Sequence, residues 1–593
     1  DLFGNEARNI KGNAGIYFRP NDDTEISFSS LIGTGEAPLP AGNARYNIKD
    51  FVVQLHKLEL KTGGLTARAF YTKEDAGKTT QSTALGTSVA NAMPGGIQNG
   101  WGAAYLGNYL GILAGGAANV PGLLGQILGD VGTGGQDIND LVGAENSLNA
   151  HFVSRYGNPA LGVTGANELM LQPGTTAFND AISNSTNQAI LTINDSGVLG
   201  ALIKDISTVS TFEANYNFED KIKFANVIVG GLYRSFNLDT DGTLYTDYDD
   251  PIEYNEFGMY AQVQKDLFDD NVSMTASMRY DKQSVMEDAN VTPRLGFLFK
   301  LSEKSNIRVS GQVGYRNPTN QDKFIGLYNG EEVLLGSTKE NIDRFNTNLG
   351  GFDWTGSQVF ETALNKSAFD ADGSIIEEKL SYVEAEKVTS YDLGYRYNSR
   401  SFTLDMNTYY SQYENFIGTN SVYVPAAIGQ PAAVAMGLGA FAQFGVDANL
   451  DVPFNTYGLS LEAIQRLSAT TSMNFIYEFN ELDYEAKANS DFELSWNTPK
   501  HRMKLGLTTN VSDNLTISAN ARYNSEYYYE SSFIDATIRE NTVYDAKITF
   551  GINALNNVKF EIGGNNIAGR EYVSIPGSGN IGSLYYGGAK IEF

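Results

Sequence analysis

The segment Val272-Ser273-Met274-Thr275-Ala276-Ser277-Met278-Arg279-Tyr280 decides the fold class of this chain. Apolar residues occupy its even-numbered positions, and polar residues occupy its odd-numbered positions. Side chains of a β-strand alternate between the two faces of a sheet, so the segment predicts a strand with one apolar and one polar face. The same alternation recurs in segments 307–315, 402–407 and 514–523.

The alternating runs are long, at about ten residues each. Strands of soluble proteins typically have about 5–6 residues, whereas a strand that crosses a membrane needs about 9–11. We therefore predict an all-β fold, a transmembrane antiparallel β-barrel with roughly 19 strands in this chain. A soluble β-solenoid or adhesin is the alternative, but no fixed short repeat supports it. The predicted strands cover residues 8–19, 23–33, 51–60, 63–73, 207–218, 221–237, 253–267, 270–285, 290–301, 305–317, 388–399, 401–416, 455–468, 470–484, 499–512, 514–530, 541–554, 557–567 and 583–593.

Short turns and long connections alternate between the predicted strands. Pro20-Asn21-Asp22 and Ser512-Asp513 are examples of the short turns. The longest connections are 74–206, 318–387 and 417–454. Outer-membrane barrels have short turns in the periplasm and longer loops outside the cell. We therefore expect these three ranges to be extracellular loops, with some helix in them.

The same alternation predicts the direction of each strand. Segment 8–19 ends in a tight turn, so it runs towards the periplasm, and segment 583–593 follows a long loop and runs the same way. Two end strands with one direction cannot close an antiparallel barrel, so we expect an odd number of further strands before residue 1. The start, Asp1-Leu2-Phe3-Gly4, has no basic region or apolar signal core. We expect residues 1–593 to be the barrel of a longer precursor.

The composition excludes several classes of protein. The chain has 42 Lys+Arg against 69 Asp+Glu and a net charge of -27, so nucleic acid is excluded as a partner. There is no Cys, which excludes disulfides and thiolate metal sites. The mean hydropathy of -0.26 excludes a polytopic helical membrane protein, which needs repeated runs of about 20 apolar residues.

Tyrosines gather near the ends of predicted strands, at Tyr409-Tyr410, Tyr527-Tyr528-Tyr529 and Tyr585-Tyr586. Tyrosine is enriched at the headgroup level of membranes, so we expect contact with outer-membrane lipid and lipopolysaccharide. Tyr585, Ile591 and Phe593 occupy alternate positions of the last strand, and the chain ends on the aromatic residue. This pattern resembles the C-terminal signal by which the membrane-assembly machinery recognises outer-membrane barrels.

Several longer motifs resemble a TonB-dependent outer-membrane receptor of the Bacteroidota type. They are Asn13-Ala14-Gly15-Ile16-Tyr17-Phe18-Arg19-Pro20-Asn21-Asp22, Tyr71-Thr72-Lys73-Glu74-Asp75-Ala76-Gly77, Gly314-Tyr315-Arg316-Asn317-Pro318-Thr319, Glu386-Lys387-Val388-Thr389-Ser390-Tyr391-Asp392-Leu393-Gly394-Tyr395 and Asn497-Thr498-Pro499-Lys500-His501. The motifs follow one another along the whole chain. The resemblance implies the outer membrane of a Gram-negative bacterium and a barrel of about 22 strands, closed by an N-terminal plug. By this resemblance we expect the sequence to be the barrel without its plug and without roughly its first three strands.

Two functions follow from the resemblance and the composition. The first is TonB-dependent active import of a scarce ligand, an iron chelate, vitamin, glycan or peptide, with TonB acting through the missing plug. The alternative is a non-transporting barrel, a subunit or docking partner in a larger outer-membrane assembly or secretion complex. Segment 79–129 contains no charged residue, so a surface lipoprotein or another outer-membrane protein is a possible partner at the long loops. An upstream plug would favour import.

No set of residues predicts an enzyme, a cofactor or a metal site. His56, His151 and His501 lie far apart along the chain, and no nucleophile spacing marks them. The acidic loop 237–248 departs from a calcium loop, because Asn237 occupies its first position and Tyr248 its last.

Four arginines are the candidate lumen-facing residues. Each lies on the polar face of a predicted strand, where it could contact an anionic ligand or the plug, or pair with an Asp or Glu of the wall. These residues are Arg279, Arg308, Arg316 and Arg522.

Overall fold

The fold is described from a computed structural model. It describes residues 6–41, 44–92, 171–190, 200–328, 332–349, 352–369, 375–426, 440–484, 492–531, 535–552, 558–576 and 578–591. The chain divides into two compact units, one formed mainly by Phe3–Thr79 and Lys204–Phe593 and the other by Thr80–Ile203.

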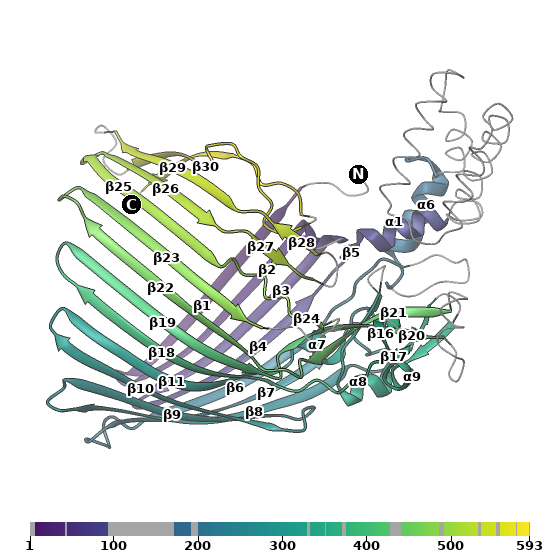
Figure 1. The fold of residues 1–593 in the computed structure, drawn as a ribbon, viewed down its shortest axis with the longest axis horizontal. Helices are drawn as coiled ribbons and strands as arrows, with labels where there is room; N and C mark the ends of the chain where they lie inside the picture. Colours follow the sequence, from purple (N-terminus) through teal and green to yellow (C-terminus); the bar gives the residue numbers. More distant parts are fainter. Residues whose placement is uncertain are drawn as a thin grey trace. The chain divides into compact units, whose positions relative to one another are not determined.

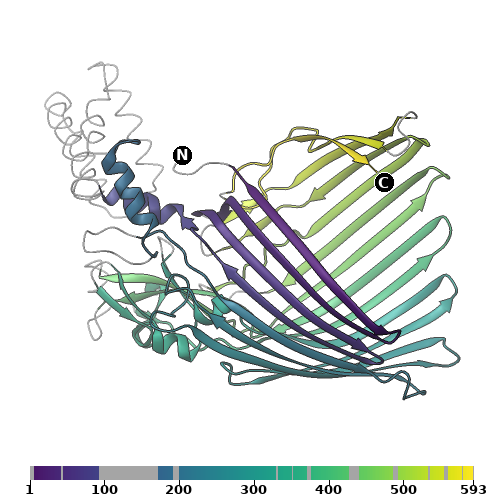
Figure 2. The same cartoon turned by 180° about the vertical axis from the view of Figure 1, so that it is seen from behind.

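The larger unit is a wall of long antiparallel strands, each hydrogen-bonded to the next in chain order. Figure 1 shows these strands slanting side by side, and Figure 2 brings the purple strands near the N-terminus to the front. The strands of the wall are β1 (Arg8–Asn21), β2 (Thr24–Ala41), β3 (Ala44–Thr62), β4 (Leu65–Asp75), β6 (Thr208–Asn217), β7 (Asn226–Leu238), β8 (Ile252–Leu267), β9 (Val272–Gln283), β10 (Ala289–Ser302), β11 (Ser305–Arg316), β18 (Glu386–Asn398), β19 (Phe402–Glu414), β22 (Phe454–Arg466), β23 (Thr471–Asp483), β25 (His501–Ser512), β26 (Leu515–Asn524), β29 (Asn541–Gly551), β30 (Val558–Asn565) and β31 (Leu584–Ile591).

The predicted antiparallel barrel is confirmed, and each predicted strand corresponds to one strand of the wall. Most boundaries agree within a few residues. Two strands are longer than predicted: β2 ends at Ala41, and β3 begins at Ala44. They are longer because the two strands keep pairing with each other beyond a register shift after Gly35. The prediction of one strand over 514–530 was wrong at its end. β26 stops at Asn524, and β27 (Tyr527–Tyr529) pairs with β28 (Ala536–Ile538) in a separate sheet.

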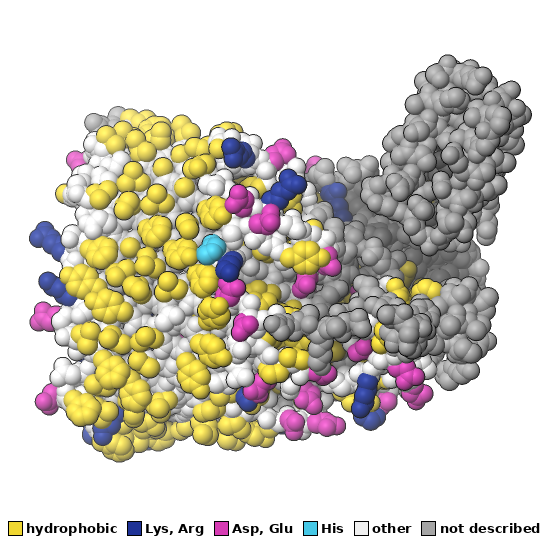
Figure 3. All heavy atoms as spheres, viewed as in Figure 1, with side chains coloured by type: hydrophobic (Ala, Val, Ile, Leu, Met, Phe, Trp, Pro, Cys, Tyr) yellow, Lys and Arg dark blue, Asp and Glu magenta, His cyan; other side chains and the backbone are white. Residues whose placement is uncertain are grey.

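The two faces of the wall differ in chemistry, as the alternation predicted. On β9, the exposed apolar residues Met278 and Tyr280 flank Arg279, which therefore lies on the other face. In the view of Figure 3, hydrophobic side chains gather over the strands, while charged side chains lie mainly towards the strand ends. Exposed apolar residues of a strand that crosses a membrane face lipid, so this surface forms the membrane contact.

The first and last strands of the wall lie at open edges. Within the described residues, β1 pairs only with β2, and β31 pairs only with β30. All residues of both strands are exposed. Because every step between neighbouring strands of the wall is antiparallel, β1 and β31 run in the same direction, as the turn lengths predicted.

Segments from two long connections fold together into what we call the loop head, residues 320–377 and 417–449. Its main sheet has the strand order β12-β13-β21-β20-β16-β17, with β24 (Phe492–Glu493) also paired to β20. The prediction treated the two connections as separate loops, but β13 and β21 pair in parallel across more than a hundred residues of chain. The elements of the head are α7 (Asn320–Phe324), β12 (Gly326–Tyr328), β13 (Val333–Leu335), α8 (Lys339–Arg344), β14 (Asn346–Leu349), β15 (Phe352–Thr355), α9 (Gly356–Thr362), β16 (Leu364–Phe369), β17 (Ile375–Glu377), β20 (Ile417–Pro425) and β21 (Phe441–Asn449).

The loop head has its own hydrophobic core. Phe444 of β21 is fully buried, and the rings of Phe345 and Trp354 meet it edge to face, with centroid distances of 6.1 and 5.9 Å. Val359 and Val422 are also fully buried in this cluster. A loop that buries large aromatic residues in this way holds a defined shape, because their burial offsets the entropy lost in ordering the chain.

The smaller unit contains β5 (Thr80–Gln81) and two described helices, α1 (Ser82–Asn91) and α6 (Thr176–Thr186). The side chain of Gln81 accepts a hydrogen bond from Ala84 N at 2.9 Å at the start of α1, and Thr175 caps α6 in the same way. Most of the uncharged segment 79–129 lies outside the described residues. No helix in the described part of the chain is long and apolar enough to cross a membrane.

Replacing Phe444 with Ala is expected to destabilise the loop head by about 3–5 kcal/mol, because it leaves a cavity among aromatic side chains. The chain has three Trp, so a background with Trp101→Phe and Trp496→Phe leaves Trp354 as the reporter. The measurement is the urea midpoint of Trp354 fluorescence. Phe352→Ala is the matched control, since Phe352 is 41% exposed. Equal midpoints for the two variants would contradict the assigned core.

Candidate functional site

The polar face of the wall is crossed by ion pairs that join neighbouring strands. The Glu59 side chain on β3 is only 6% exposed and pairs with Arg68 of β4, with Lys61 Nζ at 3.0 Å and with Lys57 Nζ at 3.7 Å. Arg68 Nη1 then reaches Glu213 Oε1 of β6 at 2.9 Å. Glu59 therefore forms ion pairs with three cations, and the chain of pairs spans three strands.

The four arginines predicted to face the lumen all carry ion pairs on this polar face. In the structure these arginines thus pair with Asp or Glu of the wall, which was one of the two predicted contacts. The pairs are Arg279 Nη2 with Asp281 Oδ1 at 2.6 Å, Arg308 Nη2 with Asp405 Oδ1 at 2.5 Å, Arg316 Nη2 with Glu386 Oε2 at 2.7 Å, and Arg522 Nε with Asp545 Oδ2 at 3.0 Å. Contact of these arginines with a ligand or a plug stays a prediction.

Arg316 also joins the wall to the loop head. Its Nη2 donates to the Ile417 carbonyl at 3.3 Å, and Ile417 N donates to Glu386 Oε2 at 3.3 Å. Ile417 is the first residue of β20, a central strand of the head. The Arg316–Glu386 pair therefore fixes the point where the head leaves the wall.

Lys323 of α7 is a second link, which the sequence analysis missed. Its side chain is 1% exposed, and Nζ donates to Tyr254 Oη at 2.9 Å and to Gln283 Oε1 at 3.3 Å. Nζ also lies 4.1 Å from the centroid of the Tyr254 ring, a cation–π contact. Burial lowers the pKa of Lys323 to about 8, against the opposing effect of Glu256 and Asp322.

A local signal for this link was present in the sequence. Thr319 and Asp322 form a capping box at the start of α7, with Asp322 N donating to Thr319 Oγ1 at 3.2 Å and Thr319 N donating to Asp322 Oδ2 at 2.8 Å. This pattern of Thr followed three residues later by an acid is typical of a helix start. It places Lys323 and the fully buried Phe324 on a helical turn.

In the acidic connection between β7 and β8, the carboxylate of Asp247 stabilises the loop. Asp247 accepts hydrogen bonds from Thr240 N, from Thr240 Oγ1 at 2.6 Å and from Gly242 N at 3.1 Å. The carboxylate thereby closes the loop through its own backbone. Among the residues that the structure describes, no three His, Asp or Glu side chains form a group able to hold a metal ion.

The remaining predicted residues lie in the wall or outside the described part. His56 stacks between the rings of Phe28 and Tyr71, with both centroid distances 6.3 Å. His501 Nδ1 and Tyr477 Oη are 3.0 Å apart. His151 lies outside the described residues.

Two of the three residues of the predicted assembly signal lie on β31. Tyr585 and Ile591 are six positions apart, so they share one face of the strand, and both are exposed, as are all residues of β31. Phe593 lies outside the described residues. The use of this face as an assembly signal stays a prediction.

A long antiparallel wall with an apolar outer surface and paired charges on the other face defines an outer-membrane β-barrel. A family model described as "TonB dependent receptor-like, beta-barrel" matches residues 90–567. The chain belongs to the TonB-dependent receptor family. It is therefore a transport protein of the Gram-negative outer membrane and not an enzyme.

Solved structures share the fold at low sequence identity. The ferric enterobactin receptor PfeA of Pseudomonas aeruginosa is similar with a TM-score of 0.57 and 11% identity, over 99% of this chain and 70% of that one. The siderophore receptor PirA of the same species has a TM-score of 0.53 and 10% identity, over 99% and 71%. The iron transporter FrpB of Neisseria meningitidis has a TM-score of 0.54 and 10% identity, over 99% of this chain and 73% of that one. A search of curated protein sequences gave no match.

Replacing Glu59 with Gln is expected to destabilise the wall by about 1–3 kcal/mol. The change leaves three cations near one another without their shared carboxylate. The destabilisation is smaller than for a fully buried ion pair, because the three cations are partly exposed to solvent. The measurement is the midpoint of urea unfolding of the full-length receptor in detergent, monitored by circular dichroism.

The matched control for this variant is Glu25→Gln. Glu25 pairs with Arg19, whose side chain is 68% exposed, so its loss is expected to cost less than about 1 kcal/mol. A control variant as unstable as Glu59→Gln would contradict the special role of Glu59.

The stability of the loop head is expected to rise between about pH 8 and pH 10.5. Folded Lys323 loses its proton near pH 8, whereas the unfolded chain holds it to the ordinary value of 10.5, so in this window the unfolded state binds more protons. Lys323→Met should flatten the rise, measured as the urea midpoint of Trp354 fluorescence against pH. The control is Lys379→Met, at an exposed lysine two residues after the end of β17. A rise that survives in Lys323→Met would contradict the assignment.

Proposed function

We propose that this protein imports an iron chelate across the outer membrane, with the energy supplied through TonB. The observation that carries the proposal is the charged face of the wall, where carboxylates and guanidinium groups pair across strands. Such groups are stable in a membrane barrel only where they face water or protein, so this face lines a polar interior. A polar interior provides a route for a hydrophilic ligand and a surface for a plug.

The ligand class rests on the structural neighbours. PfeA is named as a ferric enterobactin receptor, PirA as a siderophore receptor and FrpB as an iron transporter. A shared fold at this identity is a weak guide to ligand, so a vitamin, glycan or peptide stays an alternative cargo.

The parts of the protein would divide the work of import. The loop head and the other long connections would capture the ligand outside the cell. A plug inside the barrel would bind it, and TonB would remodel the plug. The apolar face would contact lipid and lipopolysaccharide. The uncharged segment 79–129 would offer a docking surface to a surface lipoprotein or another outer-membrane protein.

The import test uses the full-length receptor in its own host, grown under iron limitation. The probe is a set of ⁵⁵Fe-loaded siderophores of catecholate, hydroxamate and carboxylate type. We expect accumulation of at least one ⁵⁵Fe chelate to require both the receptor gene and TonB, while binding at the cell surface requires the receptor only. A matched strain with an inactive TonB separates the two steps.

Two results would contradict import of an iron chelate. Accumulation of every chelate that is unchanged by deletion of the receptor would remove iron from the proposal. A stable stoichiometric complex purified from the outer membrane, with no plug in any subunit, would favour the alternative of a non-transporting barrel.

A further inference from the structure

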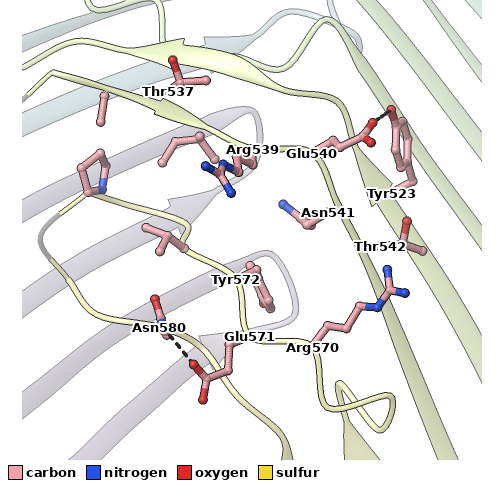
Figure 4. Close-up of a pocket in the computed structure, with 14 residues that line it drawn as sticks. Tyr523, Thr537, Arg539, Glu540, Asn541, Thr542, Arg570, Glu571, Tyr572 and Asn580 are labelled. Carbon is pink, nitrogen blue, oxygen red and sulfur yellow. Dashed lines mark hydrogen bonds between the residues drawn. The ribbon is translucent and has the colours of Figure 1, made fainter.

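A hollow of about 680 Å³ lies between two connections near the C-terminal end of the wall. One side is formed by β28 and the start of β29, residues 536–542, and the other by the connection from β30 to β31, residues 570–580. Figure 4 shows that polar and apolar side chains from both connections border the same space. Its volume is within the usual range for a small-molecule site, about 300–1,000 Å³.

Two arginines in this hollow have no acidic partner among the residues that the structure describes. Arg539 and Arg570 both line it, and neither forms an ion pair with any described residue. They differ in this respect from the four arginines of the wall discussed above. In Figure 4, Arg539 extends over the hollow from one connection, and Arg570 borders it from the other.

The two acids of the hollow are engaged by neutral donors instead. Glu540 Oε2 accepts a hydrogen bond from Tyr523 Oη at 3.0 Å, and Glu571 Oε2 accepts one from Asn580 Nδ2 at 2.9 Å. Both bonds are drawn in Figure 4. Neither carboxylate forms an ion pair with Arg539 or Arg570 in the described part of the chain, so the guanidinium N–H groups remain available to a ligand.

Part of the remaining lining is apolar, beside the polar residues Thr537, Asn541 and Thr542. Ile538 is 4% exposed and presents a buried aliphatic side chain, and Val573 and Pro576 come from the opposite connection. Tyr572 adds an aromatic ring to the same lining. A ligand that fills this space must therefore offer a flat apolar body as well as a charge.

We propose that this hollow binds a small organic anion of the aromatic-carboxylate class. The carboxylate would accept charge-assisted hydrogen bonds from Arg539 and Arg570, and the ring would lie against Tyr572 and the aliphatic side chains. Guanidinium groups match carboxylates in geometry, since both are planar and can form two parallel hydrogen bonds. The idea that this anion is part of the imported ligand rests on the proposed function. The binding of the anion in the hollow does not rest on it.

The test measures binding to the purified full-length receptor in detergent by ¹⁹F NMR. The probe is 4-fluorobenzoate, and the neutral comparison is 4-fluorobenzamide, which has almost the same shape. We expect saturable broadening of the benzoate signal that unlabelled benzoate reverses. Arg539→Gln and Arg570→Gln should each weaken binding about ten-fold, and the double variant should abolish it.

Arg400→Gln is the matched control. Arg400 lies in the turn between β18 and β19 and is exposed, so its loss removes the same charge far along the sheet from the hollow. Tyr572→Ala is a second variant that keeps both charges and removes the ring. Circular dichroism of each variant verifies the fold, and the control should bind as the parent protein does.

Three results would overturn the proposal: no saturable signal from 4-fluorobenzoate, equal binding of the neutral amide, or binding that both arginine substitutions leave unchanged. None of these depends on TonB or on transport. Import with no binding in the hollow would overturn this inference alone, and binding in the hollow without import of any ligand would overturn the proposed function alone.

Discussion

Backbone hydrogen bonding in a solvent without water is the constraint on which this structure depends. Inside a bilayer each unpaired N–H or C=O group costs several kcal/mol, so a chain built of strands must join them edge to edge. The continuous antiparallel pairing from β1 to β31 satisfies this requirement within the wall. Strand length, the two-residue alternation and the exposed apolar face all follow from it, because each strand must cross the hydrocarbon layer and present apolar side chains to lipid.

The same constraint explains why the wall was predictable from the sequence. A pattern such as Val272–Tyr280 is long enough to distinguish a membrane strand from a soluble one, and every such run became a strand. Turn lengths then predicted direction, and β1 and β31 do run the same way. The prediction failed after Asn524, because the aromatic residues Tyr527–Tyr529 continued the pattern into a separate small sheet.

The loop head was not predictable in the same way. Several of its strands are short, with three residues in β12 and in β13, so alternation has too few positions to be recognised there. β20 and β21 have nine residues each, but their buried residues do not follow a simple alternation. Its parallel pairing of β13 with β21 joins chain segments that nothing in the local sequence connects. The polar contacts that attach it, at Arg316 and Lys323, depend on partners from other strands. Only the capping box before Lys323 carried a local signal.

The surroundings of a charged residue in this protein decide whether it forms an ion pair. The chain is strongly acidic, yet arginines on the polar face of the wall, such as Arg308 and Arg522, pair with carboxylates. A charge inside a membrane barrel is costly unless it is compensated by a partner or by water. In the connections outside the wall this cost is small, and Arg539 and Arg570 form no ion pair with any described residue there. Ion pairs in the wall thus serve stability, whereas the proposed anion site uses arginines of the connections.

The most direct test of the account is the environment of successive residues along β9. Since the chain has no Cys, single cysteines can carry spin labels in the full-length receptor in lipid vesicles. The account predicts strict alternation. Labels should collide mainly with oxygen, which concentrates in lipid, at positions Met274, Ala276, Met278 and Tyr280, and with a water-soluble nickel chelate at positions Ser273, Thr275, Ser277 and Arg279. A period near 3.6 residues, or nickel access that is the same at every position, would contradict a membrane wall with a polar interior.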